Sequence, residues 1–201
     1  MVPGSSPGGP TKYAYTAGMT APDPTTIVLH KPVGFDAIEG RKLARTLVTP
    51  ETRWPEDTTR IEPIDDHFVR LTPLVPLDRE DSGMMVFSQD GRIWRRLTED
   101  ADSIEHEYIV EVSGEIAPWG LRRLNHGLFY RRRELPPCKV SWQNEIRLRF
   151  AIKDAQPGQL RDMCAQVGLD VVAIRRIRIG KVPLGKMPVG AWRYFPVGEK
   201  F

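Results

Sequence analysis

Apolar and polar residues alternate along several short segments of the chain, and this period of two predicts β-strands with one buried face. The alternation is most regular in residues 106–112 and 145–152. A third segment, Met84–Phe87, is an unbroken apolar run between polar turn residues, which predicts a strand buried on both faces. Three further strands are expected at 25–30, 67–75 and 171–179.

A helical period of apolar residues is clearest at 159–167, where Gly168 supplies a C-terminal stop. The apolar stripe of this segment comprises Leu160, Met163, Cys164 and Val167. Residues 49–66 are polar, contain prolines and are expected to form a long loop. Three shorter helices are predicted at 39–48, 92–98 and 118–126.

The predicted strands and helices do not follow a regular strand–helix–strand order, and neighbouring strands alternate in polarity. This favours an α+β fold on a mixed, mainly antiparallel central sheet with flanking helices. Residues 1–24 are rich in Pro, Gly and Ser, and we expect a flexible tail there. Residues 25–201 then form a single folded domain.

The composition narrows the class of protein. Hydrophobic residues make up 40% of the 201 residues, which is enough for a packed core. No apolar run approaches the roughly 20 residues that span a bilayer, and no secretory signal precedes residue 25. The two cysteines, Cys138 and Cys164, lack the spacing of a disulfide framework or zinc site. We therefore expect a cytoplasmic, monomeric protein that does not enter a membrane.

The net charge of +3 is mildly basic, and the positions of the arginines are more informative than their number. Clusters stand at 122–123, 131–133 and 175–178. Each cluster alone is more typical of a solvated surface. Together they favour an anionic polymer as the partner.

Candidate chemistry lies in the loop before Met84–Phe87, where Asp78 and Asp81 stand three positions apart. Loops on a rigid scaffold often carry catalytic groups, but the same pattern fits a surface turn capped by Asp81 or Ser82. The two acids could hold Mg²⁺, although a third acid and a phosphate-binding glycine loop are missing. The four histidines are scattered without metal-ligand spacing, so no metal site is expected.

Several longer segments match known motifs in order. HKPVGF at 30–35 is similar to N-K-P-x-G, LDREDSGMMVFSQDG at 77–91 to L-D-x-D-[ST]-x-G-L-L-L-L-T-N-D-G, and HEYIVEV at 106–112 to K-x-Y-x-V-x-V. Further matching segments follow at 136–140, 158–168 and 176–193. Over residues 27 to about 195 the chain therefore resembles the RsuA-type family of ribosomal RNA pseudouridine synthases, here expected to lack the usual S4 RNA-binding domain.

The resemblance implies the pseudouridine synthase fold with a catalytic cleft. It also implies isomerisation of a specific uridine in ribosomal RNA, expected in the 23S RNA, without a cofactor or metal. Asp78 matches the catalytic aspartate, Tyr108 the tyrosine that lies against the target base, and Arg161 the basic residue that pairs with that aspartate. The residues expected to bind the substrate are Lys31, Arg79, Leu160 and Arg176. The implied partner is RNA, and not DNA.

The chain departs from the motifs at three places. Val75-Pro76 replaces a Gly-Arg pair, Pro157-Gly158 replaces a basic or polar pair, and His106 replaces a lysine. Two of these changes remove an arginine able to contact RNA. A catalytically weakened RNA-binding or ribosome-assembly protein of the same fold is therefore an alternative. A metal-dependent hydrolase that uses Asp78 and Asp81 is a third.

Overall fold

A computed structural model describes residues 23–196 and 198–201 of the chain. Most of the predicted tail, residues 1–22, lies outside these described residues. Within the described ranges, no helix is long and apolar enough to cross a membrane.

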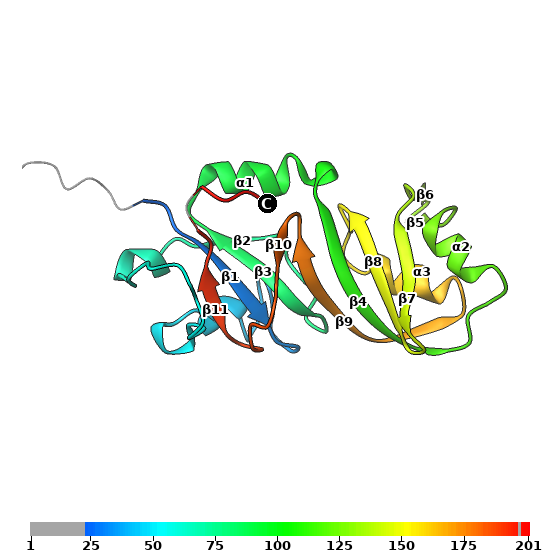
Figure 1. The fold of residues 1–201 in the computed structure, drawn as a ribbon. Helices are drawn as coiled ribbons and strands as arrows, with labels where there is room; N and C mark the ends of the chain where they lie inside the picture. The colour runs from blue at the N-terminus through cyan, green and yellow to red at the C-terminus, as the bar shows by residue number, and fades with distance from the viewer. Residues whose placement is uncertain (1–22, 197) are drawn as a thin grey trace, which may run out of the picture.

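The centre of the molecule is a nine-stranded sheet, which is drawn in Figure 1. Seven strands follow the order β11-β1-β3-β9-β4-β8-β7, β2 pairs with β3, and β10 pairs with β9. The strands of this sheet are β1 (Thr26–Lys31), β2 (Thr72–Leu74), β3 (Ser82–Ser88), β4 (Glu105–Gly114), β7 (Lys139–Asn144), β8 (Arg147–Lys153), β9 (Leu169–Ile179), β10 (Val182–Pro183) and β11 (Trp192–Tyr194).

Antiparallel pairing dominates, and among the named strands of the described residues only β3 and β9 pair in parallel, which confirms the predicted mixed, mainly antiparallel α+β fold. A separate two-stranded sheet joins β5 (Phe129–Tyr130) and β6 (Arg133–Glu134). The α-helices are α1 (Gly91–Thr98), α2 (Gly120–Asn125) and α3 (Gln159–Ala165).

The local patterns place most elements correctly. The apolar run Met84–Phe87 lies within β3 and is fully buried, and α1, α2 and α3 lie within the predicted helical segments. In β4, Tyr108 and Val110 are buried and the neighbouring Glu107 is only partly covered, as the alternation predicts, but Ile109 on the opposite face is buried as well.

The predicted helix at 39–48 is wrong. The chain there is bent, because the carbonyl and amide of Asp36 pair with Ala44 and Lys42 and close a loop. Only a short 3₁₀ helix, Ala44–Leu47, follows. The predicted loop at 49–66 holds another 3₁₀ helix, Pro50–Thr52. A further 3₁₀ helix, Ala101–Ser103, follows α1.

One strand prediction also needs correction, and two of the observed strands were not predicted. The expected strand 67–75 is reduced to β2, because Asp65–Phe68 forms a 3₁₀ helix ahead of it. The strands β7 and β11 carry no strong sequence signal. β7 is an edge strand with one buried side chain, Val140, and β11 has only three residues. Pairing with β8 and β1 makes them strands.

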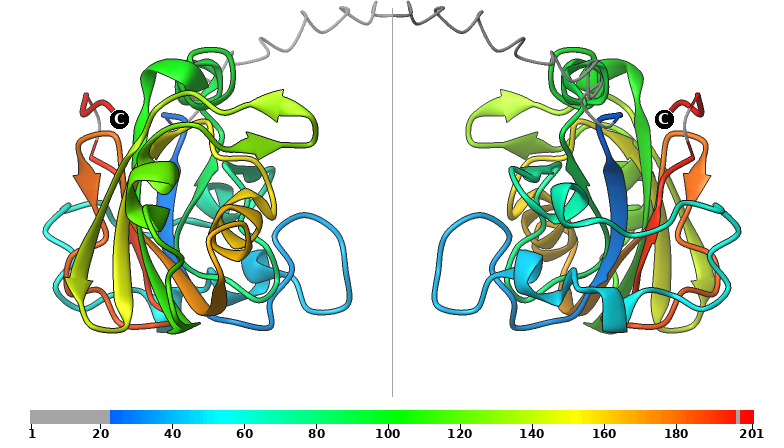
Figure 2. Two further views of the ribbon diagram at one scale, coloured as in Figure 1. Left: turned by 90° about the vertical axis from the view of Figure 1, so that its right-hand side faces the viewer. Right: turned by 90° about the vertical axis from the view of Figure 1, so that its left-hand side faces the viewer.

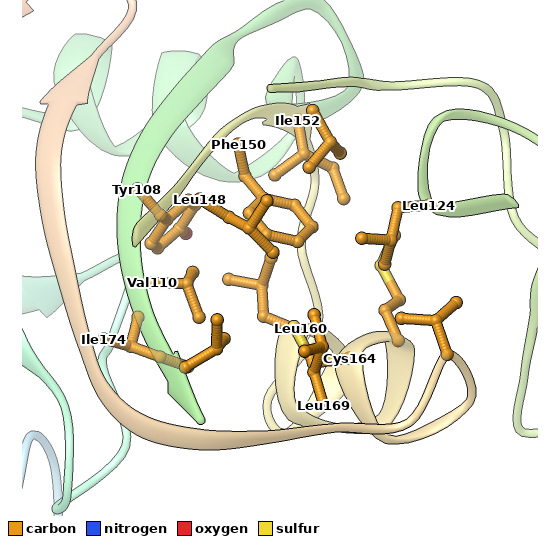
Figure 3. Packing of buried hydrophobic residues seen from close by; sticks show 14 of the residues in the cluster. Tyr108, Val110, Leu124, Leu148, Phe150, Ile152, Leu160, Cys164, Leu169 and Ile174 are labelled. Atoms are coloured by element: carbon orange, nitrogen blue, oxygen red, sulfur yellow. The ribbon is translucent and has the colours of Figure 1, made fainter. Parts of the chain in front are cut away.

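Hydrophobic packing holds the two ends of the sheet. Around β4 and β8, the apolar stripe of α3 packs against Tyr108, Leu148 and Phe150 (Figure 3). Helices α2 and α3 lie on the same side of these strands (Figure 2, left). Around β1 and β3 two further clusters bury Met84 and Trp192 among others. The loop before β3 contacts both ends, because Leu77 belongs to the cluster around β4 and β8 and Val75 packs against the cluster that contains Met84.

Gly83 brings β3 against β9. Its φ is +112°, and a Cβ atom at this position would overlap the backbone of Arg176. Only glycine permits this close approach without strain. The parallel contact of Ser82 and Gly83 with Arg175 and Arg176 thereby anchors the acidic loop 75–81 beside the middle of the sheet.

Candidate active site

Two buried cations, Lys31 and Arg176, donate hydrogen bonds to backbone carbonyls at the two ends of the loop 75–81. Lys31, at the end of β1, is 0% exposed, and its Nζ donates to the carbonyl oxygens of Asp81 (2.7 Å) and Pro32 (3.1 Å). Arg176 of β9 donates through Nε to the Met84 carbonyl at 2.8 Å and through Nη2 to the Val75 carbonyl. Charged donors bound to backbone carbonyls fix the path of the loop.

Asp78 is half-buried on this loop. Its Oδ2 accepts a hydrogen bond from the backbone N–H of Gly158 at 3.0 Å. Gly158 adopts a left-handed conformation immediately before α3, with φ of +75°. Two loops that are 80 residues apart in sequence therefore meet at the Asp78 carboxylate.

The resemblance implied that Arg161 of α3 pairs with Asp78, and the structure shows that it does not. Its Nη2 donates to Oδ1 of Asp81, which is only 6% exposed. Burial raises the pKa of the Asp81 carboxyl, the charge of Arg161 opposes that rise, and the charge of Asp78 adds to it. The sequence offered two carboxylates three positions apart, and only the orientation of α3 against the loop selects one of them.

Tyr108 projects from β4 and is 4% exposed. The guanidinium of Arg176 lies 5.9 Å from the centre of its ring, and Nδ1 of His106 lies 3.5 Å from its hydroxyl oxygen. Burial lowers the pKa of His106 to about 3, and the nearby charges of Arg176 and Arg178 add to this effect. His106, which replaces the lysine of the motif, is thus a neutral, buried neighbour of the tyrosine.

These groups surround a cavity of about 300 Å³, which we call the front cavity. It is lined by residues of the loop 75–81, of β4 and β9, and of the segment 154–161, with the end of α1 at its edge. Five of the seven predicted site residues line it: Asp78, Tyr108, Leu160, Arg161 and Arg176.

The other two predicted substrate-binding residues lie elsewhere. Lys31 is buried beneath the loop and does not line the front cavity, so the structure assigns it to holding the loop instead. Arg79 points away from the cavity and forms an ion pair with Asp36, with Nη1 2.8 Å from Oδ2. Arg79 follows Asp78 in the sequence, and Lys31 contacts the same loop. Neither position was enough to predict the direction of the side chain.

Several lining residues carry no predicted binding role: His106, Asp81 and the backbone around Pro157-Gly158. The departures from the motifs would have pointed to His106 and Pro157-Gly158, because both stand inside matched segments. In the described part of the chain, no group of three or more His, Cys, Asp or Glu residues is arranged to hold a metal ion.

Comparison with known proteins gives both a fold and a set of relatives. A crystal structure described as pseudouridylate synthase superposes with a TM-score of 0.72 at 19% identity, over 87% of this chain and 71% of that one. The fold is therefore the pseudouridine synthase fold. No family model matches the chain.

Among curated proteins, the dual-specificity RNA pseudouridine synthase RluF of Escherichia coli K12 is 26% identical over 175 residues. That match spans 86% of this chain and 55% of the relative. The putative ribosomal large subunit pseudouridine synthase SVR1 of Arabidopsis thaliana is 25% identical, over 79% of this chain and 40% of the relative. By sequence the chain is similar to RNA pseudouridine synthases of this kind, and it spans about half the length of the curated relatives it matches.

Proposed function

We propose that the protein is an RNA pseudouridine synthase that isomerises a uridine in ribosomal RNA, with Asp78 as the reacting carboxylate. The observation that carries the proposal is the convergence of Asp78, Tyr108 and Arg161 on the front cavity from three distant segments. The relatives support the reaction class through their names. Two of them, from Arabidopsis thaliana and Vibrio parahaemolyticus, are named for the large ribosomal subunit, which favours 23S RNA as the substrate.

The reaction breaks the bond between C1′ and N1 of uridine and forms a bond between C1′ and C5. The C5 proton is lost and a proton is gained at N1, so the product is an isomer and no co-substrate is consumed. An aspartate at the ribose can act as nucleophile or as base. The hydrogen bond from the Gly158 amide leaves the other oxygen of Asp78, Oδ1, available to face the sugar.

The cavity walls can orient the base. Tyr108 and Leu160 present apolar surface to a flat ring, and the guanidinium of Arg176 lies 5.9 Å from the centre of the Tyr108 ring. A uridine must leave its stack to enter, which costs a few kcal/mol if the base was paired. Exposed arginines that bind phosphates would offset that cost.

The guanidinium of Arg161 reaches the cavity beside both carboxylates. Its bond to Asp81 holds a positive charge next to Asp78 without blocking the Asp78 carboxylate. When RNA displaces water from the cavity, the positive charge of Arg161 would favour the ionised form of the Asp78 carboxylate.

The test is the Asp78→Asn variant assayed for uridine isomerisation on ribosomal RNA. We expect loss of isomerisation with RNA binding retained, because the amide keeps the size of the side chain and its acceptor oxygen. Asp170→Asn, which removes an exposed carboxylate of β9, is the matched control and should retain activity. Robust activity of Asp78→Asn would remove Asp78 from the mechanism.

A binding-only role is the second candidate. The observation that favours it is the engagement of Arg161 with Asp81, together with Pro76 and Pro157 in the cavity wall. Pseudouridine mapping of ribosomal RNA from cells lacking the protein separates the two. A position that loses its modification supports the enzyme, and an unchanged map supports the binding role.

A further inference from the structure

A second cavity lies on the opposite face of the sheet from Asp78. Side chains of adjacent residues in a strand point to opposite faces. In β4, Tyr108 lines the front cavity and Glu107 lines the second one; in β9, Arg176 and Arg175 divide in the same way. This rear cavity has a volume of about 570 Å³.

The rear cavity is rich in positive charge. It is lined by Arg149, Arg175, Arg178 and Lys186, with Glu107 as its one acidic residue. Arg149 and Arg178 both pair with Glu107, with N–O distances of 2.6 and 3.0 Å. Arg175 and Lys186 are exposed and form no ion pair within the described ranges. Two cations are therefore available for an external anion.

A buried histidine in the wall of the rear cavity lacks one partner. His30 of β1 is 5% exposed, and its Nδ1 bonds the Met187 carbonyl oxygen at 2.7 Å. Its Nε2 is the one buried side-chain nitrogen or oxygen without a hydrogen-bond partner among the residues that the structure describes. Leaving such an atom unsatisfied is unfavourable, so the site is short of one polar group.

The chemistry of the ring identifies the missing group. Because Nδ1 faces a carbonyl oxygen, it carries the proton, and Nε2 of the neutral ring is an acceptor. Burial lowers the pKa of His30 below its ordinary 6.5; the bond to the Met187 carbonyl opposes this shift and the charge of Arg175 adds to it, so the neutral ring predominates at pH 7. The complementary ligand group is a hydrogen-bond donor such as a hydroxyl.

We propose that the rear cavity is a second contact site for the RNA strand, in which Arg175 and Lys186 hold phosphates and a ribose 2′-hydroxyl donates to Nε2 of His30. RNA presents a hydroxyl beside each phosphate, whereas DNA has no such group and an acidic peptide need not supply one. Because Nε2 is covered in the structure, the proposal requires the side chains around it to move aside when RNA binds. The inference rests on the RNA binding of the proposed function and not on its chemistry.

The test measures affinity for a short fluorescein-labelled oligouridylate at several salt concentrations. Every arm uses the 201-residue chain carrying Asp78→Asn, so that binding is read without turnover. In the Arg175→Gln/Lys186→Gln variant we expect weaker binding and a salt slope reduced by about 0.7 for each lost phosphate contact. Arg45→Gln/Arg60→Gln removes the same charge from exposed positions outside both cavities and should keep the parent slope. An equal loss in the two variants, or none in either, overturns the proposal.

A second arm tests the ribose contact. His30→Asn keeps a donor near the position of Nδ1 and removes the Nε2 acceptor, and Asn is the residue in the motif that this segment resembles. We expect the preference for the oligouridylate over its deoxy counterpart to fall about two- to tenfold, the worth of one hydrogen bond. An unchanged preference overturns the assignment to RNA and makes the cavity a site for any polyanion.

The location is checked independently of affinity. Methylation of lysines followed by mass spectrometry should show that RNA protects Lys186. Exposure of Lys186 in the saturated complex overturns the site even if ribosomal RNA is isomerised. Conversely, protection of Lys186 together with an inactive parent enzyme rejects the proposed function and leaves this site standing.

Discussion

The guanidinium of Arg161 is bonded to the buried carboxylate of Asp81 and not to Asp78, which lies three residues earlier in the same loop. Asp78 instead accepts a hydrogen bond from the backbone amide of Gly158. The two acids of the loop therefore have separate partners, one from a side chain and one from the backbone. This division leaves Asp78 exposed to the front cavity while Asp81 anchors α3 to the loop.

The Arg161–Asp81 contact should be visible in a double-mutant cycle of unfolding free energies. Asp81→Asn and Arg161→Ala are expected to couple by about 1 kcal/mol, because the arginine remains one-third exposed and solvent weakens the pair. The same cycle between Asp78→Asn and Arg161→Ala serves as the control and should give a smaller coupling, because no direct hydrogen bond joins this pair and solvent screens it. Urea unfolding of the single and double variants provides the measurement. The reverse order of the two couplings would place the ion pair on Asp78.

Lys31 should affect catalysis through the loop rather than through RNA. In Lys31→Met the Asp81 carbonyl loses its buried donor, which we expect to destabilise the fold by about 2 kcal/mol and to misplace Asp78. A small misplacement can lower kcat about a hundredfold. The salt dependence of RNA affinity should stay as in the parent, since Lys31 is fully buried. A reduced salt slope in titrations of this variant would instead make Lys31 a phosphate contact.

His106 should make the protein less stable in mild acid. Its pKa is about 3 in the folded state and 6.5 as its ordinary value, so below pH 6.5 the unfolded chain binds a proton that the folded chain rejects. The contribution of His106 to stability is present above pH 6.5 and is lost as the pH falls toward 3. The expected loss is about 1.4 kcal/mol per pH unit.

Urea unfolding of the parent and of His106→Gln between pH 7 and 4.5 measures this effect, with exposed His126→Gln as the control. The slope of stability against pH should flatten for His106→Gln and not for the control. His30 and His67, whose pKa values burial also lowers, add to the parent slope and cancel in the difference. Parallel slopes for parent and His106→Gln would contradict a neutral His106.

Local patterns of apolar residues were enough to predict several helices and strands. The apolar stripe of α3, the alternation of β4 and β8 and the apolar run of β3 each reflect a face that any compact fold must bury. The matched motifs also predicted seven site residues, and five of these line one cavity in the structure. Two segments depend on backbone partners that their own patterns do not reveal: 39–48 is bent by hydrogen bonds to nearby Asp36, and β11 is extended by pairing with the distant β1.

The contacts between site side chains depend on how distant elements pack together. Arg161 could reach either acid of the loop, Lys31 could point outward or inward, and Arg79 could face the cavity or Asp36. Local sequence leaves these choices open, because each contact joins elements separated by 43 to 80 residues. The packing of β1, β3, β9 and α3 settles their directions, and with them the surroundings of Asp78 and the second cavity at His30.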